Sequence, residues 1–312
     1  MKFRSLVIVP LVAAAVLGTS AAAFTATTSG QAGQPQALPA LTSQALSARY
    51  ASDAQAIVRD IRVADQAGNS QLVASLTQLR THQVLFFAPQ GQGLAGMVIG
   101  NLATARRVVI LVPGSDTTLS TFFSRGTSSP GGGADALAAQ VRRLSPGANL
   151  AIIAWLGYST PSLLSPSVMT SGDASAGAAA LRPLVDGLAR HGDQVALLCH
   201  SYGSVLCGVA APDLPVTDIA VFGSPGMDAS SAAALDTRAR VWAGRESSDW
   251  VRFVPHIRLF GLGFGADPMS PGFGARVFAT GDGEHSDYLT PGSVSLRNLG
   301  YIALGDPAAV TR

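Results

Sequence analysis

Short apolar runs alternate with alanine-rich segments over most of this 312-residue chain, and this alternation restricts its fold more than any other feature. The runs are apolar throughout and not only at every second position, which indicates strands that are buried on both faces. They lie at 106–114, 149–157, 194–200, 217–223, 239–244 and 275–281. Helical segments are predicted between several of them, at 133–144, 173–190, 203–210 and 229–236. The predicted fold class is therefore α/β, with a mostly parallel central sheet and helices on both faces.

Two further apolar runs, HQVLFFAP and LAGMVIG, precede these strands and predict a hairpin. The turn between them begins a G-x-G-x-x-G match at residues 91–96, the pattern of a dinucleotide-binding loop. That loop must open a helix, because the pyrophosphate binds the N–H groups of a helix N-terminus. Here the apolar MVIG follows, which indicates a strand. A tight glycine turn is favoured, and no cofactor is predicted.

The N-terminal part of the chain divides into three predicted segments. Residues 1–23 have a basic start, an apolar stretch and small residues at 21–23, which is typical of a cleaved signal peptide. An uncleaved anchor is the alternative, but the apolar stretch is short for a membrane span. Residues 24–40 read as a flexible leader rich in Thr, Ser, Gln, Gly and Pro. Residues 41–82 predict a helical appendage with a break at 68–70, and 83–312 predict the main domain.

Charge is sparse and balanced, which bears on the class of partner. The chain has 21 basic and 19 acidic residues, and removal of Lys2 and Arg4 with the signal peptide leaves 21 − 2 = 19 basic residues. No basic run or stripe remains, so nucleic acid is not predicted as a partner. The expected location is secreted or in the cell envelope, without a stable membrane span once the signal is cleaved. The sequence leaves the oligomeric state open.

The stretch LLCHSYGSVLCG, residues 197–208, places Ser201 between a predicted strand and a predicted helix. A sharp strand-to-helix turn exposes a serine hydroxyl and points the next N–H at a developing oxyanion, which is the nucleophile elbow. Small residues are needed two positions to either side. Gly203 meets this requirement, and Cys199 stands where glycine is usual. Ser201 is the predicted nucleophile; a buried serine at a helix cap is the alternative.

Cys199 and Cys207 are the only cysteines, and they flank Ser201. In an oxidising compartment they would form a disulfide if the strand and the returning helix face each other. Two buried thiols that pack as small apolar groups are the alternative. No metal site is predicted, because two cysteines alone cannot hold zinc and no further ligands lie at suitable spacing.

The base and the acid should follow the nucleophile, each after the end of a strand. His285 lies in GDGEHSDY, just past the last predicted strand, and is the predicted base. Asp249 follows the strand at 239–244 and is the first choice for the acid, with Glu246 beside it. Asp267, in FGADPMSP, is the second choice.

Two backbone N–H groups are predicted to form the oxyanion hole. One belongs to Tyr202, directly after the nucleophile. The other belongs to Ser115, in the loop LVPGSDTT that follows the strand at 106–114.

Together these pieces resemble the α/β-hydrolase superfamily, and more narrowly a family of secreted bacterial α/β hydrolases known as a domain of unknown function. The resemblance spans most of residues 83–312. It implies a serine hydrolase with Ser201 and His285 in its active site, and it implies no substrate. The stretches that carry it are LVPGSDT (111–117), WLGYSTP (155–161), LLCHSYGSVLCG (197–208), VFGSPGM (221–227), SDWVRFVPH (248–256) and GEHSDYL (283–289).

Three functions remain open at this point. The leading one is a secreted carboxylic-ester hydrolase that acts on a small-molecule ester through an acyl-enzyme. The second is an amidase or peptidase with the same triad. The third is a non-catalytic binding or cell-envelope protein that keeps the fold without turnover.

Overall fold

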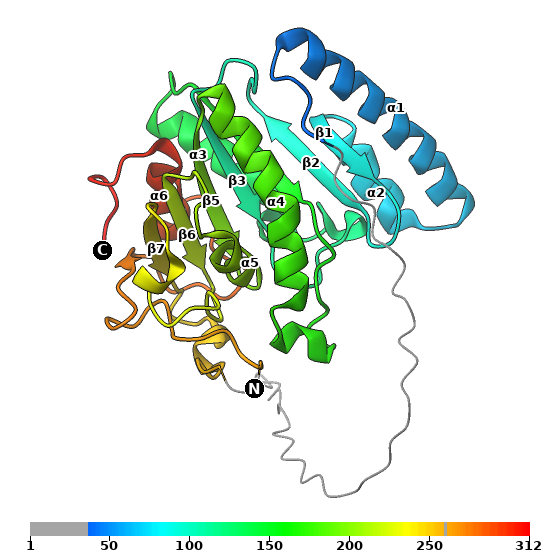
Figure 1. Ribbon diagram of the computed structural model, residues 1–312. Helices are drawn as coiled ribbons and strands as arrows, with labels where there is room; N and C mark the ends of the chain where they lie inside the picture. Colours follow the sequence, from blue (N-terminus) through cyan, green and yellow to red (C-terminus); the bar gives the residue numbers. More distant parts are fainter. Residues whose placement is uncertain (1–36, 259–260) are drawn as a thin grey trace, which may run out of the picture. The chain divides into compact units, whose positions relative to one another are not determined.

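The computed structural model describes residues 37–258 and 261–312 (Figure 1). One sheet contains eight strands in the order β1-β2-β4-β3-β5-β6-β7-β8. β1 pairs antiparallel with β2, β2 pairs antiparallel with β4, and every other neighbouring pair is parallel. The predicted hairpin and the mostly parallel sheet are confirmed. The strands are β1 Gln83–Ala88, β2 Leu94–Ile99, β3 Arg107–Val112, β4 Leu150–Leu156, β5 Gln194–His200, β6 Asp218–Phe222, β7 Arg240–Gly244 and β8 Arg276–Val277.

Helices cover both faces of the sheet (Figure 1). α4 (Gly172–His191) and α5 (Gly203–Ala210) pack on one face, and α3 (Pro130–Leu144) and α6 (Val294–Leu304) pack on the other. Alternate residues of β3 enter the two apolar clusters, Val108 and Ile110 on the first face and Val109 on the second. Because successive side chains of a strand point to opposite faces, a strand buried on both faces must be apolar throughout.

Two helices precede the sheet, as the sequence predicts, and pack against it beside β1. They are α1 (Ser43–Gln66) and α2 (Ser70–Leu79). Thr42 and Asn69 cap their N-termini through side-chain oxygens. Each helix contributes fully buried apolar side chains to the sheet's core, so the segment is part of the folded unit.

The predicted signal peptide, residues 1–23, lies outside the described residues, as does most of the predicted leader, 24–40. Its last four residues, 37–40, are described and have no regular secondary structure. The Arg49 guanidinium donates a hydrogen bond to the Ala37 carbonyl, and Leu38 lies against α4 at Gly187. These four residues therefore contact the folded unit.

The predicted helix at 229–236 is wrong. Only a single 3-10 turn, Ala233–Leu235, forms there. Asp228 and Asp236 on either side have positive φ angles of 55° and 46°, which an α-helix cannot contain. The backbone between them bonds instead to a distant segment, since Ala232 N–H donates to the Phe273 carbonyl.

The last strand is shorter than predicted, and the C-terminal helix α6 has no counterpart in the sequence prediction. β8 contains two residues where the apolar run 275–281 predicts seven. Ala279 N–H donates to the Thr311 carbonyl and not to β7, so the chain leaves the sheet edge there. In the part of the chain that the structure describes, no helix has the length and hydrophobicity to cross a bilayer.

A buried carboxylate connects several strands at the end of the sheet that lies opposite to Ser201. Asp218, at the start of β6, accepts hydrogen bonds from Arg107 of β3 at 2.8 Å and from Arg240 and Trp242 of β7 at 2.7 and 3.0 Å. Burial alone would raise the pKa of Asp218, but these hydrogen bonds outweigh it and hold the pKa below its usual value. Arg107 also donates to the Ala303 carbonyl of α6 at 2.6 Å. One ionised side chain therefore links three strands and, through Arg107, a helix.

We expect Asp218→Asn to lower the free energy of unfolding by about 3 kcal/mol, because it leaves two guanidinium groups without their counter-charge. Urea denaturation measures the change. Asp65→Asn, on the exposed face of α1, is the matched control and should stay within about 0.5 kcal/mol of wild type. Equal stability of the Asp218 variant and the control would contradict the structural role of this carboxylate.

Candidate active site

Ser201 occupies the sharp turn between β5 and α5. Its φ angle is 52°, a left-handed conformation that costs a non-glycine residue about 1–2 kcal/mol. Two backbone hydrogen bonds hold the turn: Ser201 N–H donates to the Phe222 carbonyl at 3.0 Å, and Ser204 N–H donates to the Ser201 carbonyl at 2.9 Å. The strand, the turn and the helix lie as the sequence predicts, and the strain is concentrated at the serine.

Two glycines allow neighbouring segments to approach this turn. A Cβ at Gly203 would lie 2.7 Å from the Pro113 carbonyl oxygen, and a Cβ at Gly114 would lie 2.6 Å from the Ser201 Cβ. Both spacings are too short for any side chain. The loop after β3 therefore lies directly against Ser201.

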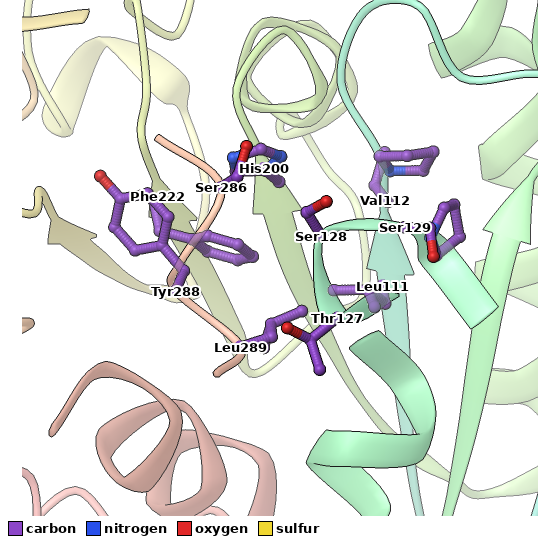
Figure 2. A pocket seen from close by; sticks show the side chains of 12 residues that line it. Leu111, Val112, Thr127, Ser128, Ser129, His200, Phe222, Ser286, Tyr288 and Leu289 are labelled. Carbon is purple, nitrogen blue, oxygen red and sulfur yellow. The ribbon is translucent and has the colours of Figure 1, made fainter. Parts of the chain in front are cut away.

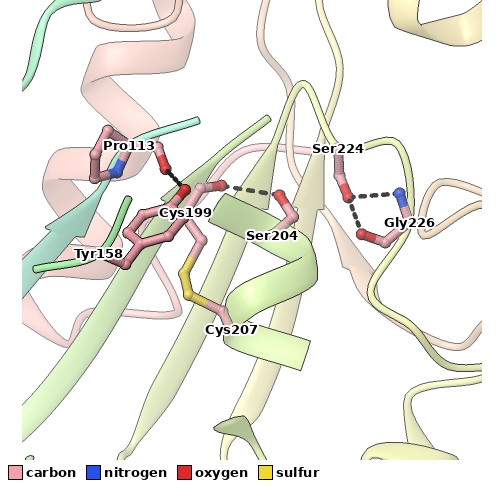
Figure 3. Close-up of a disulfide and its surroundings, with 7 residues drawn as sticks. All are labelled: Pro113, Tyr158, Cys199, Ser204, Cys207, Ser224 and Gly226. Atoms are coloured by element: carbon pink, nitrogen blue, oxygen red, sulfur yellow. Dashed lines mark hydrogen bonds between the residues drawn. A yellow bond between two sulfur atoms is a disulfide. The ribbon is translucent and has the colours of Figure 1, made fainter. Parts of the chain in front are cut away.

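The structure joins Cys199 of β5 and Cys207 of α5 by a disulfide (Figure 3). Both residues are fully buried, and Ser204 Oγ of the same helix donates to the Cys199 carbonyl at 3.2 Å. The bridge fastens the strand before Ser201 to the helix after it. A cysteine two residues before the serine thus packs without crowding the turn.

Ser201, His285 and Asp249 form a continuous chain of hydrogen bonds. His285 Nε2 lies 2.9 Å from Ser201 Oγ, and His285 Nδ1 lies 2.9 and 3.0 Å from the two Asp249 carboxylate oxygens. A carboxylate only accepts, so Nδ1 carries the proton and Nε2 accepts from the serine hydroxyl. This tautomer makes His285 a base toward Ser201.

Two loops bring Asp249 and His285 together. The loop after β7 donates from Ser247 N–H to the Gly281 carbonyl and from Ser248 N–H to the Gly283 carbonyl. Gly223, with φ 58°, lies beneath the pair, and a Cβ there would be 3.1 Å from both the Asp249 carboxylate and the His285 ring. The close approach of Asp249 and His285 therefore depends on contacts between segments that are distant in sequence.

Asp249 is fully buried and stays ionised. Burial alone would raise its pKa, but hydrogen bonds from His285, from the Tyr288 hydroxyl at 2.5 Å and from Val251 N–H at 2.8 Å outweigh it, so the pKa is below its usual value. The Tyr288 hydroxyl in turn accepts from Glu246 N–H at 3.0 Å. The sequence prediction did not include Tyr288, because a tyrosine three residues after the histidine carries no recognisable signal.

The other predicted acids lie elsewhere. Asp267 forms an ion pair with Arg245 at 2.9 Å and also accepts from Met269 N–H. Glu246 is buried and accepts from Gly283 N–H at 3.0 Å, and burial raises its pKa. Neither carboxylate contacts His285, so the structure places Asp249 there and not the second choice.

Ser115 and Tyr202, the predicted oxyanion donors, both lie at the turn. Tyr202 directly follows Ser201 and precedes α5, and Ser115 follows Gly114, which contacts Ser201. Among the described residues, neither backbone N–H has a recorded hydrogen-bond acceptor. The Ser115 hydroxyl is likewise buried without a partner in this part of the chain. These donors remain available to a ligand oxygen.

A cleft of about 200 Å³ opens over Ser201 and His285. Hydroxyl side chains form much of its lining, together with Arg125, and Leu163 and Trp250 contribute apolar surface. The Trp250 ring centroid is 4.8 Å from that of His285, and the indole is 46% exposed. Over residues 37–258 and 261–312, no three His, Cys, Asp or Glu side chains are grouped so as to hold a metal ion.

A smaller pocket lies beside this cleft and shares His200 and Ser286 with it (Figure 2). Leu111, Phe222 and Leu289 give it an apolar lining. Its volume of about 20 Å³ leaves room for one water-sized group.

His200, the residue directly before Ser201, contacts the site. Its Nε2 donates to the His285 carbonyl at 2.9 Å, and its ring stacks on Phe222. Burial, followed by the repulsion that a protonated His285 would exert, lowers the pKa of His200 to about 3, so the ring is neutral near pH 7. His200 therefore fixes the backbone of the base and adds no charge to the site.

A mostly parallel sheet with a serine at the strand-to-helix turn and a histidine beyond the last strand is the arrangement of α/β hydrolases. The chain belongs to this family, since the alpha/beta hydrolase family model matches residues 88–259.

Similar proteins extend the comparison. The chain is 33% identical over 251 residues to an uncharacterized protein of Mycobacterium tuberculosis, an alignment that covers 69% of this chain and 37% of the relative. It is 34% identical over 151 residues to an uncharacterized protein of Mycobacterium bovis, covering 46% and 56%. The chain thus spans little more than a third of the length of the first relative.

Solved structures are similar at low identity. A hydrolase of Thermoplasma acidophilum has a TM-score of 0.45 and 14% identity, covering 72% of this chain and 96% of its own. An esterase of Thermogutta terrifontis has a TM-score of 0.44 and 15% identity, covering 73% and 91%. Neither likeness transfers an activity to this chain.

We expect His200 to make the fold acid-labile. Its pKa is below the usual 6.5, so below pH 6.5 the unfolded chain binds a proton that the folded chain does not, and stability falls with pH toward 3. In His200→Gln, which can still donate to the His285 carbonyl, the loss of unfolding free energy from pH 7 to pH 5 should be smaller by about 2 kcal/mol.

Urea denaturation at the two pH values measures this difference. His191→Gln, at the C-terminal end of α4, controls for the loss of a histidine as such. An unchanged pH dependence in His200→Gln would show that the neutral, buried ring is not the source.

Proposed function

We propose that this protein is a secreted serine hydrolase that cleaves carboxylic esters. The observation that carries the proposal is the hydrogen-bond chain from Ser201 Oγ through His285 to the ionised Asp249, at a strand-to-helix turn. A non-catalytic protein would have no use for a strained serine that donates to a histidine of fixed tautomer.

In the proposed reaction, Ser201 Oγ attacks the ester carbonyl carbon while His285 Nε2 takes its proton. Asp249 holds the imidazole in place and stabilises the imidazolium that forms. His285 then gives the proton to the departing alkoxide, and an acyl-enzyme remains. A water molecule, deprotonated by His285, attacks the acyl-enzyme and releases the acid and the free serine.

The negative oxygen of each tetrahedral intermediate would be bound by the backbone N–H groups of Tyr202 and Ser115. Their position beside Ser201 and their lack of a recorded acceptor within the described residues support this role. Gly114 makes it possible, because any side chain there would push the loop away from the serine.

The cleft supports an ester over a peptide substrate. It is compact, and its residues come from a few loop ends and not from the edge of the sheet, where an extended peptide would bind. An alkoxide also leaves a tetrahedral intermediate more readily than an amine, so the ester is the less demanding reaction for this triad.

Export of the protein is part of the proposal. It rests on the signal-peptide pattern of residues 1–23, and the Cys199–Cys207 disulfide supports it, because such bonds persist in oxidising compartments.

We expect a fluorophosphonate probe to label the wild-type protein covalently and Ser201→Ala to remain unlabelled, because the probe reacts only with an activated serine. Gel fluorescence and mass spectrometry of the labelled peptide measure the reaction. Ser204→Ala, a buried serine three residues further on that donates to the Cys199 carbonyl, is the matched control and should be labelled. A folded wild-type protein that takes up no probe would contradict the proposal.

We expect Asp249→Asn to lower kcat toward a soluble ester by about 10⁴-fold, because the amide favours the wrong imidazole tautomer. Asp267→Asn breaks only the ion pair with Arg245 and should stay within a few-fold of wild type. Initial rates under saturating ester give the comparison. A larger loss from Asp267 than from Asp249 would reverse the proposed roles.

A further inference from the structure

Large apolar side chains are exposed mainly in two segments that each contribute one residue to the lining of the cleft. Ten such side chains are exposed among the described residues, and six of them lie in just two segments, 163–169 and 250–257. Leu164 is 96% exposed and Phe253 is 74% exposed. We define the apolar rim as Leu163, Leu164, Met169, Trp250, Phe253 and Ile257. Single exposed apolar residues are ordinary, but a group of six is not.

The two segments border the same cleft. Leu163 and Trp250 line it directly. Beyond the cleft the segments are joined through Gly263, whose N–H donates to the Met169 carbonyl and whose Cα lies against the Ile257 carbonyl. The two segments that carry the apolar rim are therefore neighbours, and both reach the cleft that contains the proposed nucleophile.

One arginine lies within the second segment and another directly follows it. Arg252 and Arg258 are exposed and enclose Phe253 and Ile257 in the sequence RFVPHIR. The Arg252 guanidinium lies 4.7 Å above the Phe253 ring, and Arg258 pairs with Asp228. Apolar side chains next to arginine are the composition of surfaces that bind at a lipid–water boundary, where the ring enters the acyl region and the cation meets anionic headgroups.

We propose that the apolar rim docks on a lipid surface with anionic headgroups, and that the ester cleaved at Ser201 is a lipid taken from that surface. The inference rests on the proposed function for its second half. Docking places the cleft mouth against the lipid, so an acyl chain passes from the surface to Ser201 along Leu163 and Trp250 without crossing water. Arg252 favours the anionic surface, and the apolar side chains provide the insertion.

Vesicle binding tests the docking without using activity. Ser201→Ala protein without residues 1–23, the predicted signal peptide, is sedimented with vesicles of phosphatidylcholine alone, or of phosphatidylcholine and phosphatidylglycerol in equal parts. We expect binding to the mixed vesicles, weakened about tenfold or more in a Leu164→Ser, Phe253→Ser double variant. Val63→Ser removes a comparably exposed apolar side chain on α1 and should bind as the parent does.

A separate variant tests how much positive charge contributes to vesicle binding. Arg252→Gln should weaken binding to the mixed vesicles by about fivefold and leave binding to phosphatidylcholine unchanged. Equal binding by all variants, or no binding by the parent, overturns the proposal. A concentration-dependent dimer that the double variant abolishes, without vesicle binding, overturns it in favour of a second copy of the chain.

Activity separates this proposal from the proposed function. In otherwise wild-type protein, the rate on a diacylglycerol held in mixed vesicles is divided by the rate on a short soluble ester. We expect the double variant to lower this ratio about tenfold and Val63→Ser to leave it unchanged. If the double variant and Val63→Ser give equal ratios, the proposal that the substrate is a lipid is overturned. Absence of any soluble-ester hydrolysis contradicts the esterase, while the vesicle-binding result still decides the docking.

Discussion

The backbone turn at Ser201 sets the position of the other groups around it. Its positive φ lifts the side chain out of the sheet, and this conformation is stable only because β6 accepts the Ser201 N–H and the loop after β3 packs closely at Gly114. The disulfide between Cys199 and Cys207 holds the strand and helix on either side at a fixed angle. Strain at one residue is thus supported by contacts with three neighbouring strands or helices.

The partners of Ser201 are placed by loop-to-loop hydrogen bonds and not by the sheet itself. Asp249 and His285 come from segments 36 residues apart, and backbone bonds at Gly281 and Gly283 align them. Tyr288 and Val251 then satisfy the fully buried Asp249 carboxylate, which keeps it ionised away from solvent. His200 donates a hydrogen bond to the His285 carbonyl and, because its ring is neutral, it adds no competing charge.

The two ends of the sheet differ in how completely their polar and apolar groups are paired. At one end, Asp218 and its arginine partners form a buried, fully bonded network that links strands and α6. At the other, the Ser115 and Tyr202 N–H groups have no acceptor among the described residues, and Trp250 and the rest of the apolar rim are exposed. A folded chain of limited stability can carry such an unsatisfied surface only where the rest of the structure is well packed.

The sequence alone determined the sheet and the strand, turn and helix around Ser201, and it predicted the order of the proposed nucleophile, acid and base, because each depends on local patterns: continuous apolar runs, small residues around Ser201 and polar loops after strands. It left open the acid and the cysteine pairing, and it failed at 229–236, where bonds to a distant segment replace the helix. It also gave no sign of Tyr288 or of His200 facing the site. These depend on which loops meet in space, and hydrogen bonds between residues far apart in the chain decide that only once the fold has formed.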